Sequence, residues 1–163
     1  MKTPLITRQG YIILQQELEH LWKHTRPEIT EKVTWAASLG DRSENADYKE
    51  NKRKLKSIDK RIRYLTQRLT QLKIIDHHPQ QKGKVFFGAT VTIENLETAK
   101  QKIILIVGYD EIFHHQENST IQRISIDSPM ARALIGKIIG DIVYVKTPTT
   151  TIEWEVLHIE YIT

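Results

Sequence analysis

The chain has 163 residues, of which 39% are hydrophobic and 27% charged; this balance fits one ordinary domain or two small ones and excludes disorder along the whole length. Cysteine is absent, which excludes disulfides and thiolate metal sites. No apolar run approaches the roughly 20 residues that span a bilayer, and the first twenty residues lack the pattern of a signal peptide, so we expect a soluble cytoplasmic protein with no membrane contact.

The first half of the chain is predicted to be helical. Thr7 is a residue type that caps helix N-termini, and apolar residues at helical spacing follow it. The spacing lengthens between Leu21 and Val33, so the apolar stripe drifts around the helix. Pro27 lies in the same stretch and cannot donate a backbone hydrogen bond, which predicts a kink or local break. The stripe comprises Leu14, Leu18, Leu21, Ile29, Val33 and Ala36.

A second helical stripe alternates steps of three and four residues, the spacing of a coiled-coil seam. It comprises Leu55, Ile58, Ile62, Leu65, Leu69 and Leu72. Between the stripes, Gly40 is expected to end the first helix, and Asp41 or Ser43 to cap the second. So short a break predicts an antiparallel hairpin, about 45 Å long for about 30 residues per helix. Trp22 and Trp35 are expected to pack along it.

The pattern changes at residues 76–83, where proline and glycine punctuate a predicted linker. Short β-type runs follow, at residues 84–87, 90–93, 102–107, 121–126, 141–145 and 152–159, with one or two helical turns at 129–134. Trp154 is expected in their core. The predicted class is therefore α+β: a long antiparallel coiled-coil hairpin over residues 1–77, a linker over 78–83, and a small, mostly antiparallel domain over 84–163.

The predicted turn of the hairpin is acidic. Asp41 and Glu44 stand three residues apart, and Asp47 follows three residues later. If the helix starts at Ser43, Glu44 and Asp47 share one face and Asp41 leans over it. Carboxylate oxygens suit Mg²⁺, but two of them do not complete its coordination, and water, phosphate or another protein must supply the rest. The alternative is that these acids only cap the helix and complement its dipole.

The second helix is strongly basic. Residues 49–63 hold eight Lys/Arg and two acidic residues, a net +6, and residues 1–77 as a whole carry 16 Lys/Arg and 10 Asp/Glu, again +6. Residues 78–163 carry 8 and 10, a net −2. This asymmetry predicts a polyanion bound along the second helix through phosphate contacts, with Tyr48 and Tyr64 available to stack on bases. The alternative is an ordinary solvated helix face.

Several separate segments together resemble the bacterial Gre transcript cleavage factors, a family of transcription elongation factors, and the basic second helix is closer to its GreB branch. These segments are residues 3–5 (TPL), 35–48 (WAASLGDRSENADY), 83–89 (GKVFFGA), 108–113 (GYDEIF) and 126–134 (IDSPMARAL). The sequence departs from the family pattern around residues 95–102 and 114–123, where we expect surface loops.

The resemblance implies a coiled-coil hairpin followed by a domain similar to FK506-binding proteins. It implies docking on bacterial RNA polymerase, entry of the hairpin into the secondary channel, and stimulated hydrolysis of the RNA 3′ end in backtracked complexes. Asp41 and Glu44 become the acidic pair, with Ser43 beside them, and hold Mg²⁺ only together with the polymerase; no cofactor is expected on the free chain, which we expect to be a monomer.

The resemblance also implies roles away from the turn. The basic face would hold the extruded RNA, through Lys52, Arg53, Lys54, Lys56, Lys60 and Arg61, and Asp127, Ser128 and Pro129 lie in the polymerase-docking segment.

Three rival functions remain: an inhibitor of the same architecture that blocks the channel, a self-sufficient nuclease, and a prolyl isomerase. The intact Asp41 and Glu44 argue against the first, the lack of a catalytic base against the second, and fold alone does not support the third. The chain is therefore expected to be an accessory factor rather than an enzyme.

Overall fold

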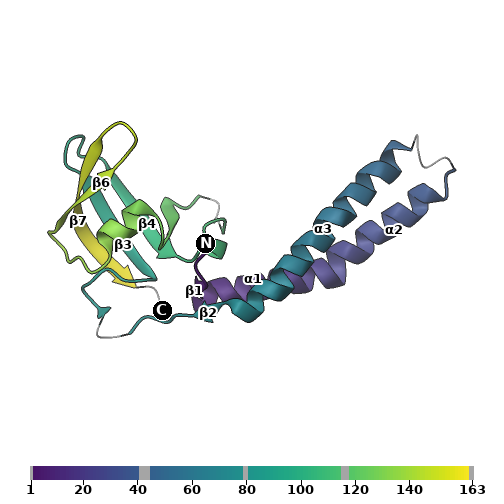
Figure 1. Ribbon diagram of the computed structural model, residues 1–163, viewed down its shortest axis with the longest axis horizontal. Helices are drawn as coiled ribbons and strands as arrows, with labels where there is room; N and C mark the ends of the chain where they lie inside the picture. The colour runs from purple at the N-terminus through teal and green to yellow at the C-terminus, as the bar shows by residue number, and fades with distance from the viewer. Residues whose placement is uncertain (1, 41–44, 79–80, 115–117, 162–163) are drawn as a thin grey trace. The chain divides into compact units, whose positions relative to one another are not determined.

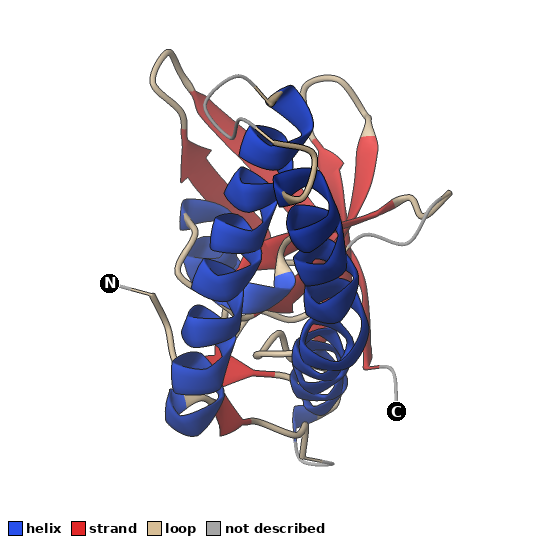
Figure 2. Ribbon diagram, turned by 90° about the vertical axis from the view of Figure 1, so that its right-hand side faces the viewer, coloured by secondary structure: helices blue, strands red, loops and turns tan. Residues whose placement is uncertain are grey.

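The fold is known from a computed structural model, which describes residues 2–40, 45–78, 81–114 and 118–161 (Figure 1). The chain divides into two compact units: Tyr11–Leu72, and Met1–Gly10 together with Lys73–Thr163. The first unit is helical and the second holds a β-sheet, which confirms the α+β class (Figure 2). Among the described residues, no helix combines the length and the apolar character needed to cross a bilayer.

The helical unit is an antiparallel hairpin of two arms. The first arm consists of α1 (Arg8–His20), a π-helical segment η1 (Leu21–Thr25) and α2 (Arg26–Ala37), and the second arm is α3 (Ala46–Gln71). α2 and α3 lie side by side (Figure 1). Both predicted stripes face the partner arm: Leu14, Ala36 and Leu65 are fully buried, and the other stripe residues are half-buried. The seam prediction is confirmed.

The predicted break at Pro27 is also confirmed. α1 gives way to the π-helical turn at Leu21, and the Arg26 amide donates to the Leu21 carbonyl, five residues back. Pro27 then occupies the first turn of α2, where a backbone donor is not needed. The wider turn therefore lets the arm continue past a residue that cannot donate to the preceding turn.

Polar contacts fix the register of the two arms. The Arg26 guanidinium lies 2.7 Å from the Asp59 carboxylate, and Arg61 donates to both oxygens of Glu17 at 2.6 and 2.9 Å. These side chains are partly exposed, so each pair contributes at most about 1 kcal/mol. Their value lies in specificity, because each pair forms in only one alignment of the helices.

The expectation that Trp22 and Trp35 pack along the hairpin is wrong. Their side chains remain 59% and 61% exposed. The seam of the first arm is filled instead by Ile29, Val33 and Ala36. Trp35 directly precedes Ala36 and so falls off their three-to-four spacing. Trp22, seven residues before Ile29, lies within the π-helical segment η1, where the α-helical spacing does not hold. Trp22 stacks under the Arg26 guanidinium, which lies 5.7 Å from the ring centroid.

The second unit is built on a five-stranded sheet in the order β5-β4-β3-β7-β6. Its strands are β3 (Ala89–Asn95), β4 (Gln101–Val107), β5 (Ile121–Ser125), β6 (Ile142–Lys146) and β7 (Thr151–Tyr161). β4 and β5 are parallel and the remaining pairs are antiparallel, so the sheet is mostly antiparallel, as predicted. The short helix α4 (Pro129–Leu134) contributes Ala131 and Leu134 to the core, where Trp154 is also buried.

Two strand predictions need correction. Residues 84–87 form only an isolated bridge, between Lys84 and Ile138, because the chain turns at Gly88, whose φ of +88° suits glycine. Conversely, β1 (Leu5–Ile6) and β2 (Lys73–Ile74), two short parallel strands that begin and end the helical region, were not expected. Strands of two residues separated by more than 60 positions leave no recognisable periodicity.

A buried carboxylate holds the start of α1. Glu111, in the 3₁₀ turn η3 (Tyr109–Glu111), has no exposed surface and accepts from the amides of Thr7 (3.0 Å) and Gly108 (2.9 Å) and from the Thr7 hydroxyl. The Thr7 hydroxyl in turn accepts from the Gly10 amide at 3.0 Å, which confirms Thr7 as the N-cap. Glu111 thus serves the first turn as a local capping-box glutamate would, from 104 residues away.

Candidate functional site

The predicted acidic pair lies between α2 and α3. Asp41, Ser43 and Glu44 are outside the described residues, so their roles stay predictions. The structure describes the chain on either side. α2 ends at Ala37, and Gly40 follows with φ of +117°, in agreement with the expected helix end at glycine.

Asn45 caps the second arm, so the expectation that Asp41 or Ser43 would cap it is wrong. α3 begins at Ala46, and the Asn45 side-chain oxygen accepts from the Tyr48 amide at 3.0 Å. The Asn45 amide group also donates to the carbonyl of Ala36, on the other arm, at 2.7 Å. One side chain thus caps α3 and bonds to the other arm, so the residues that precede and follow the acidic segment are joined.

The capping preference of asparagine was visible in the sequence, but the interarm bond was not. Asn45 precedes Tyr48 by three residues, the spacing of a capping side chain and the amide that it binds. α3 starts at Ala46, so the helix start considered at Ser43 is wrong, and the expected common face of Glu44 and Asp47 involves a residue outside the described ones. Asp47 remains in the first turn of α3, where its charge complements the helix dipole.

The basic face of α3 is exposed, as predicted. Of the six residues assigned to RNA, Arg61 is the most engaged within the chain, through Glu17, and Lys54 forms a looser pair with Glu50 at 3.6 Å. The remaining four are Lys52, Arg53, Lys56 and Lys60, all exposed. The Lys52 ammonium lies 5.4 Å from the centroid of the Tyr48 ring, so an aromatic face adjoins the basic residues near the start of α3.

The predicted docking segment forms the start of α4. The Ser128 hydroxyl accepts from the Ala131 amide at 3.2 Å, which makes Ser128 the N-cap of this helix. Asp127 and Pro129 on either side are exposed. Ser128 therefore shapes the turn, and its two neighbours are the residues available to a partner surface.

The described residues contain no group of three or more histidine, aspartate or glutamate side chains placed to hold a metal ion. The chemistry of the expected Mg²⁺ ligands, two carboxylates three residues apart, suits a hard cation. These are Asp41 and Glu44, outside the described residues, so the metal expectation remains a matter of their chemistry and position in the chain.

Comparison with known proteins covers both units. Residues 4–74 match the family model of the transcription elongation factor N-terminal domain, and residues 80–161 match that of the GreA/GreB C-terminal domain. The chain is 58% identical over 161 residues to the transcription elongation factor GreB of Vibrio cholerae, covering 99% of this chain and 97% of the relative. It is 55% identical over 161 residues to GreB of Pseudomonas putida, covering 99% and 96%. The solved structure of GreA factor homolog 1 of Thermus thermophilus covers 96% of this chain and 97% of its own, at 25% identity and a TM-score of 0.41.

Proposed function

Since the chain belongs to the GreA/GreB family of transcription elongation factors, we propose that it binds bacterial RNA polymerase and stimulates cleavage of the RNA 3′ end in backtracked complexes. The observation that carries the proposal is the match over both units to GreB relatives, together with an acidic pair, Asp41 and Glu44, between the two arms of a hairpin. The chain would act as a monomer and as an accessory to the polymerase.

The hairpin suits delivery of a few side chains into a narrow passage. α3 has 26 residues, about 39 Å of helix at 1.5 Å per residue. Asn45 joins its start to the end of α2, so the acidic segment connects two helix ends that are tied to each other. The residues on either side of the acidic segment are therefore held together.

We assign to Asp41 and Glu44 the binding of a catalytic Mg²⁺ whose other ligands come from the polymerase, with the Ser43 hydroxyl beside them. When bound, such a metal ion activates the attacking water or stabilises the leaving oxygen in phosphodiester hydrolysis. An incomplete ligand set in this chain fits that role, because the site is completed only in the complex.

The basic face of α3 would hold the extruded RNA by its phosphates. Lys52, Arg53, Lys56 and Lys60 are exposed, and Lys54 and Arg61 could join them by exchanging a carboxylate for a phosphate. The Tyr48 ring offers a stacking surface for a base next to Lys52. The exposed Asp127 and Pro129, on a turn held by Ser128, are the proposed contacts of the second unit with the polymerase.

The test is incubation of the purified chain with a backtracked polymerase complex whose RNA is labelled. We expect release of short 3′ fragments, and its loss in Asp41→Ala and Glu44→Ala variants that still bind polymerase. Binding without any cleavage by the wild-type chain would instead indicate a channel-blocking inhibitor. RNA cleavage by the isolated chain in Mg²⁺ buffer would identify a nuclease.

The RNA assignment is tested separately. Replacing Arg53, Lys54, Lys56 and Lys60 by alanine should reduce crosslinking to the RNA 3′ segment more than it reduces polymerase binding, and wild-type binding should weaken as salt rises. Unchanged crosslinking in the fourfold variant would show that α3 presents only a solvated face.

A further inference from the structure

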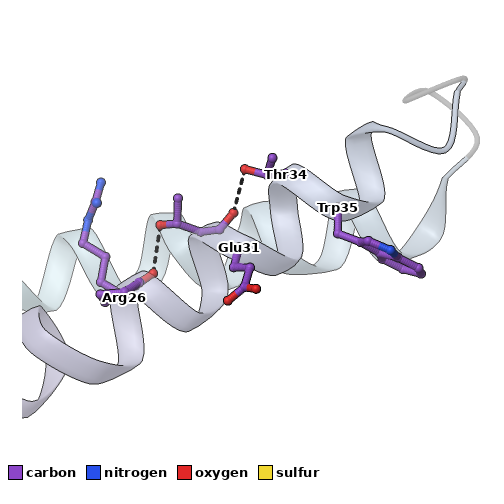
Figure 3. Close-up of a pocket in the computed structure, with 6 residues that line it drawn as sticks. Arg26, Glu31, Thr34 and Trp35 are labelled. Carbon is purple, nitrogen blue, oxygen red and sulfur yellow. Dashed lines mark hydrogen bonds between the residues drawn. The ribbon is translucent and has the colours of Figure 1, made fainter.

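The outer face of α2 carries an apolar hollow to which the proposed function gives no role. The hollow has a volume of about 650 Å³ and is lined by Arg26, Pro27, Thr30, Glu31, Thr34 and Trp35, all on this helix. Figure 3 shows the Trp35 indole and the Glu31 carboxylate projecting away from the helix backbone. We call the last five of these residues the Trp35 strip.

The polar groups of the strip are largely occupied within the helix. The Thr30 hydroxyl donates to the Arg26 carbonyl at 2.8 Å, and the Thr34 hydroxyl to the Thr30 carbonyl at 3.0 Å (Figure 3). These residues therefore offer chiefly their methyl groups to a partner, beside the Pro27 ring and the indole. The Arg26 guanidinium at the edge of the hollow is bound to Asp59.

Glu31 gives the strip its one distinct charge. It is exposed, and no cation among the described residues lies within ion-pair distance of it, whereas the neighbouring Glu28 pairs with Lys32 at 3.6 Å. A polyanion is disfavoured beside this carboxylate, and the basic face of α3 offers it a far better site. An apolar surface with a single unmatched carboxylate is suited to protein, with a cation opposite Glu31.

We propose that the Trp35 strip is a docking surface for a protein segment that presents an aliphatic side chain to the indole and a lysine or arginine to Glu31. This inference rests on the proposed function, and the segment belongs to the polymerase surface that the hairpin passes. The two arms then divide the work: α2 contacts protein and α3 contacts RNA. A tryptophan with 61% of its surface left to bury is the residue type that most often dominates such interfaces.

Trp22 provides a matched control. It lies on the same arm, is 59% exposed, and is outside the hollow. The experiment compares Trp35→Ala, Glu31→Lys and Trp22→Ala by their affinity for RNA polymerase and by the cleavage rate of backtracked complexes at saturating protein. Because all three side chains are exposed, the helical circular dichroism should match that of the wild type.

We expect Trp35→Ala to weaken polymerase binding about tenfold, or about 1.4 kcal/mol, and Glu31→Lys to weaken it several-fold. Trp22→Ala should stay within about twofold of the wild type, and all three should cleave at the wild-type rate once bound. If Trp35→Ala bound RNA polymerase with wild-type affinity while the wild-type chain stimulated cleavage, the docking role of the Trp35 strip would be overturned and the proposed function would stand. The strip proposal would also be overturned if Trp35→Ala kept its polymerase affinity but lost crosslinking to RNA, because the strip would then bind RNA. A wild-type chain that does not bind polymerase would overturn the strip and the proposed function together.

Discussion

Replacement of Asn45 should loosen the hairpin next to its acidic segment. Asn45→Ala removes the N-cap of α3, worth about 1 kcal/mol, and the bond to the Ala36 carbonyl, worth about 1 kcal/mol. The Ala36 carbonyl also accepts from the Leu39 amide at 3.2 Å, so no buried acceptor is left unpaired and no larger penalty is expected. The sum of about 2 kcal/mol corresponds to roughly 30-fold more frequent opening of the first turn of α3.

Two further variants separate the contributions. Asn45→Asp keeps a capping oxygen for the Tyr48 amide but loses the donor to Ala36, so it should show about half the effect. Asn51→Ala is the matched control, because the Asn51 amide group donates to the Asp47 carbonyl at 2.9 Å within α3 and makes no described bond to the other arm. It should change the opening free energy by less than about 0.5 kcal/mol.

Hydrogen exchange of the Tyr48 amide measures this opening directly, since that amide donates to Asn45. The Tyr48 amide should exchange fastest in Asn45→Ala, more slowly in Asn45→Asp, and slowest, at equal rates, in Asn51→Ala and the wild type. In backtracked polymerase complexes, Asn45→Ala should slow cleavage about tenfold at saturating protein, because the carboxylates of Asp41 and Glu44 would be held less well. Equal Tyr48 exchange in Asn45→Ala and Asn51→Ala would refute the reasoning.

Three other outcomes follow from the packing and charge of the two units. Gly108→Ala should cost about 3 kcal/mol in urea denaturation, because a Cβ at this position would overlap the backbone oxygen of Leu5, which cannot move like a side chain. Leu65→Ala, at a fully buried seam position, should cost about 2–5 kcal/mol and lower the melting temperature of the helical signal. The hydrogen bonds from Arg8 lower the pKa of Asp76 below its ordinary value of 3.8. The pair therefore stabilises the fold above pH 3.8, and this contribution disappears as the pH falls through the lowered pKa. Arg8→Gln should reduce the loss of unfolding free energy on acidification, measured by urea denaturation across this pH range.

Features that depend on near neighbours in the chain were predictable from the sequence. The two apolar stripes specify two helices, because a three-to-four spacing buries one side of each whatever the details of packing. Thr7 as a cap and the break at Pro27 follow from the backbone chemistry of those two residues. The alternation in the second half located the five strands of the main sheet, and the acidic and basic character of the hairpin was plain from composition.

Only the tertiary structure decided which side chains reach across the fold. Asn45 bonds to a carbonyl nine residues earlier on the opposite arm, and Glu111 holds a helix start 104 residues away. The exposure of Trp35 likewise depends on which residues of the first arm pack into the seam. Local periodicity reports burial of a face but not the partner that covers it, so pairings of this kind, and the surfaces that they leave open, appear only when the chain is folded.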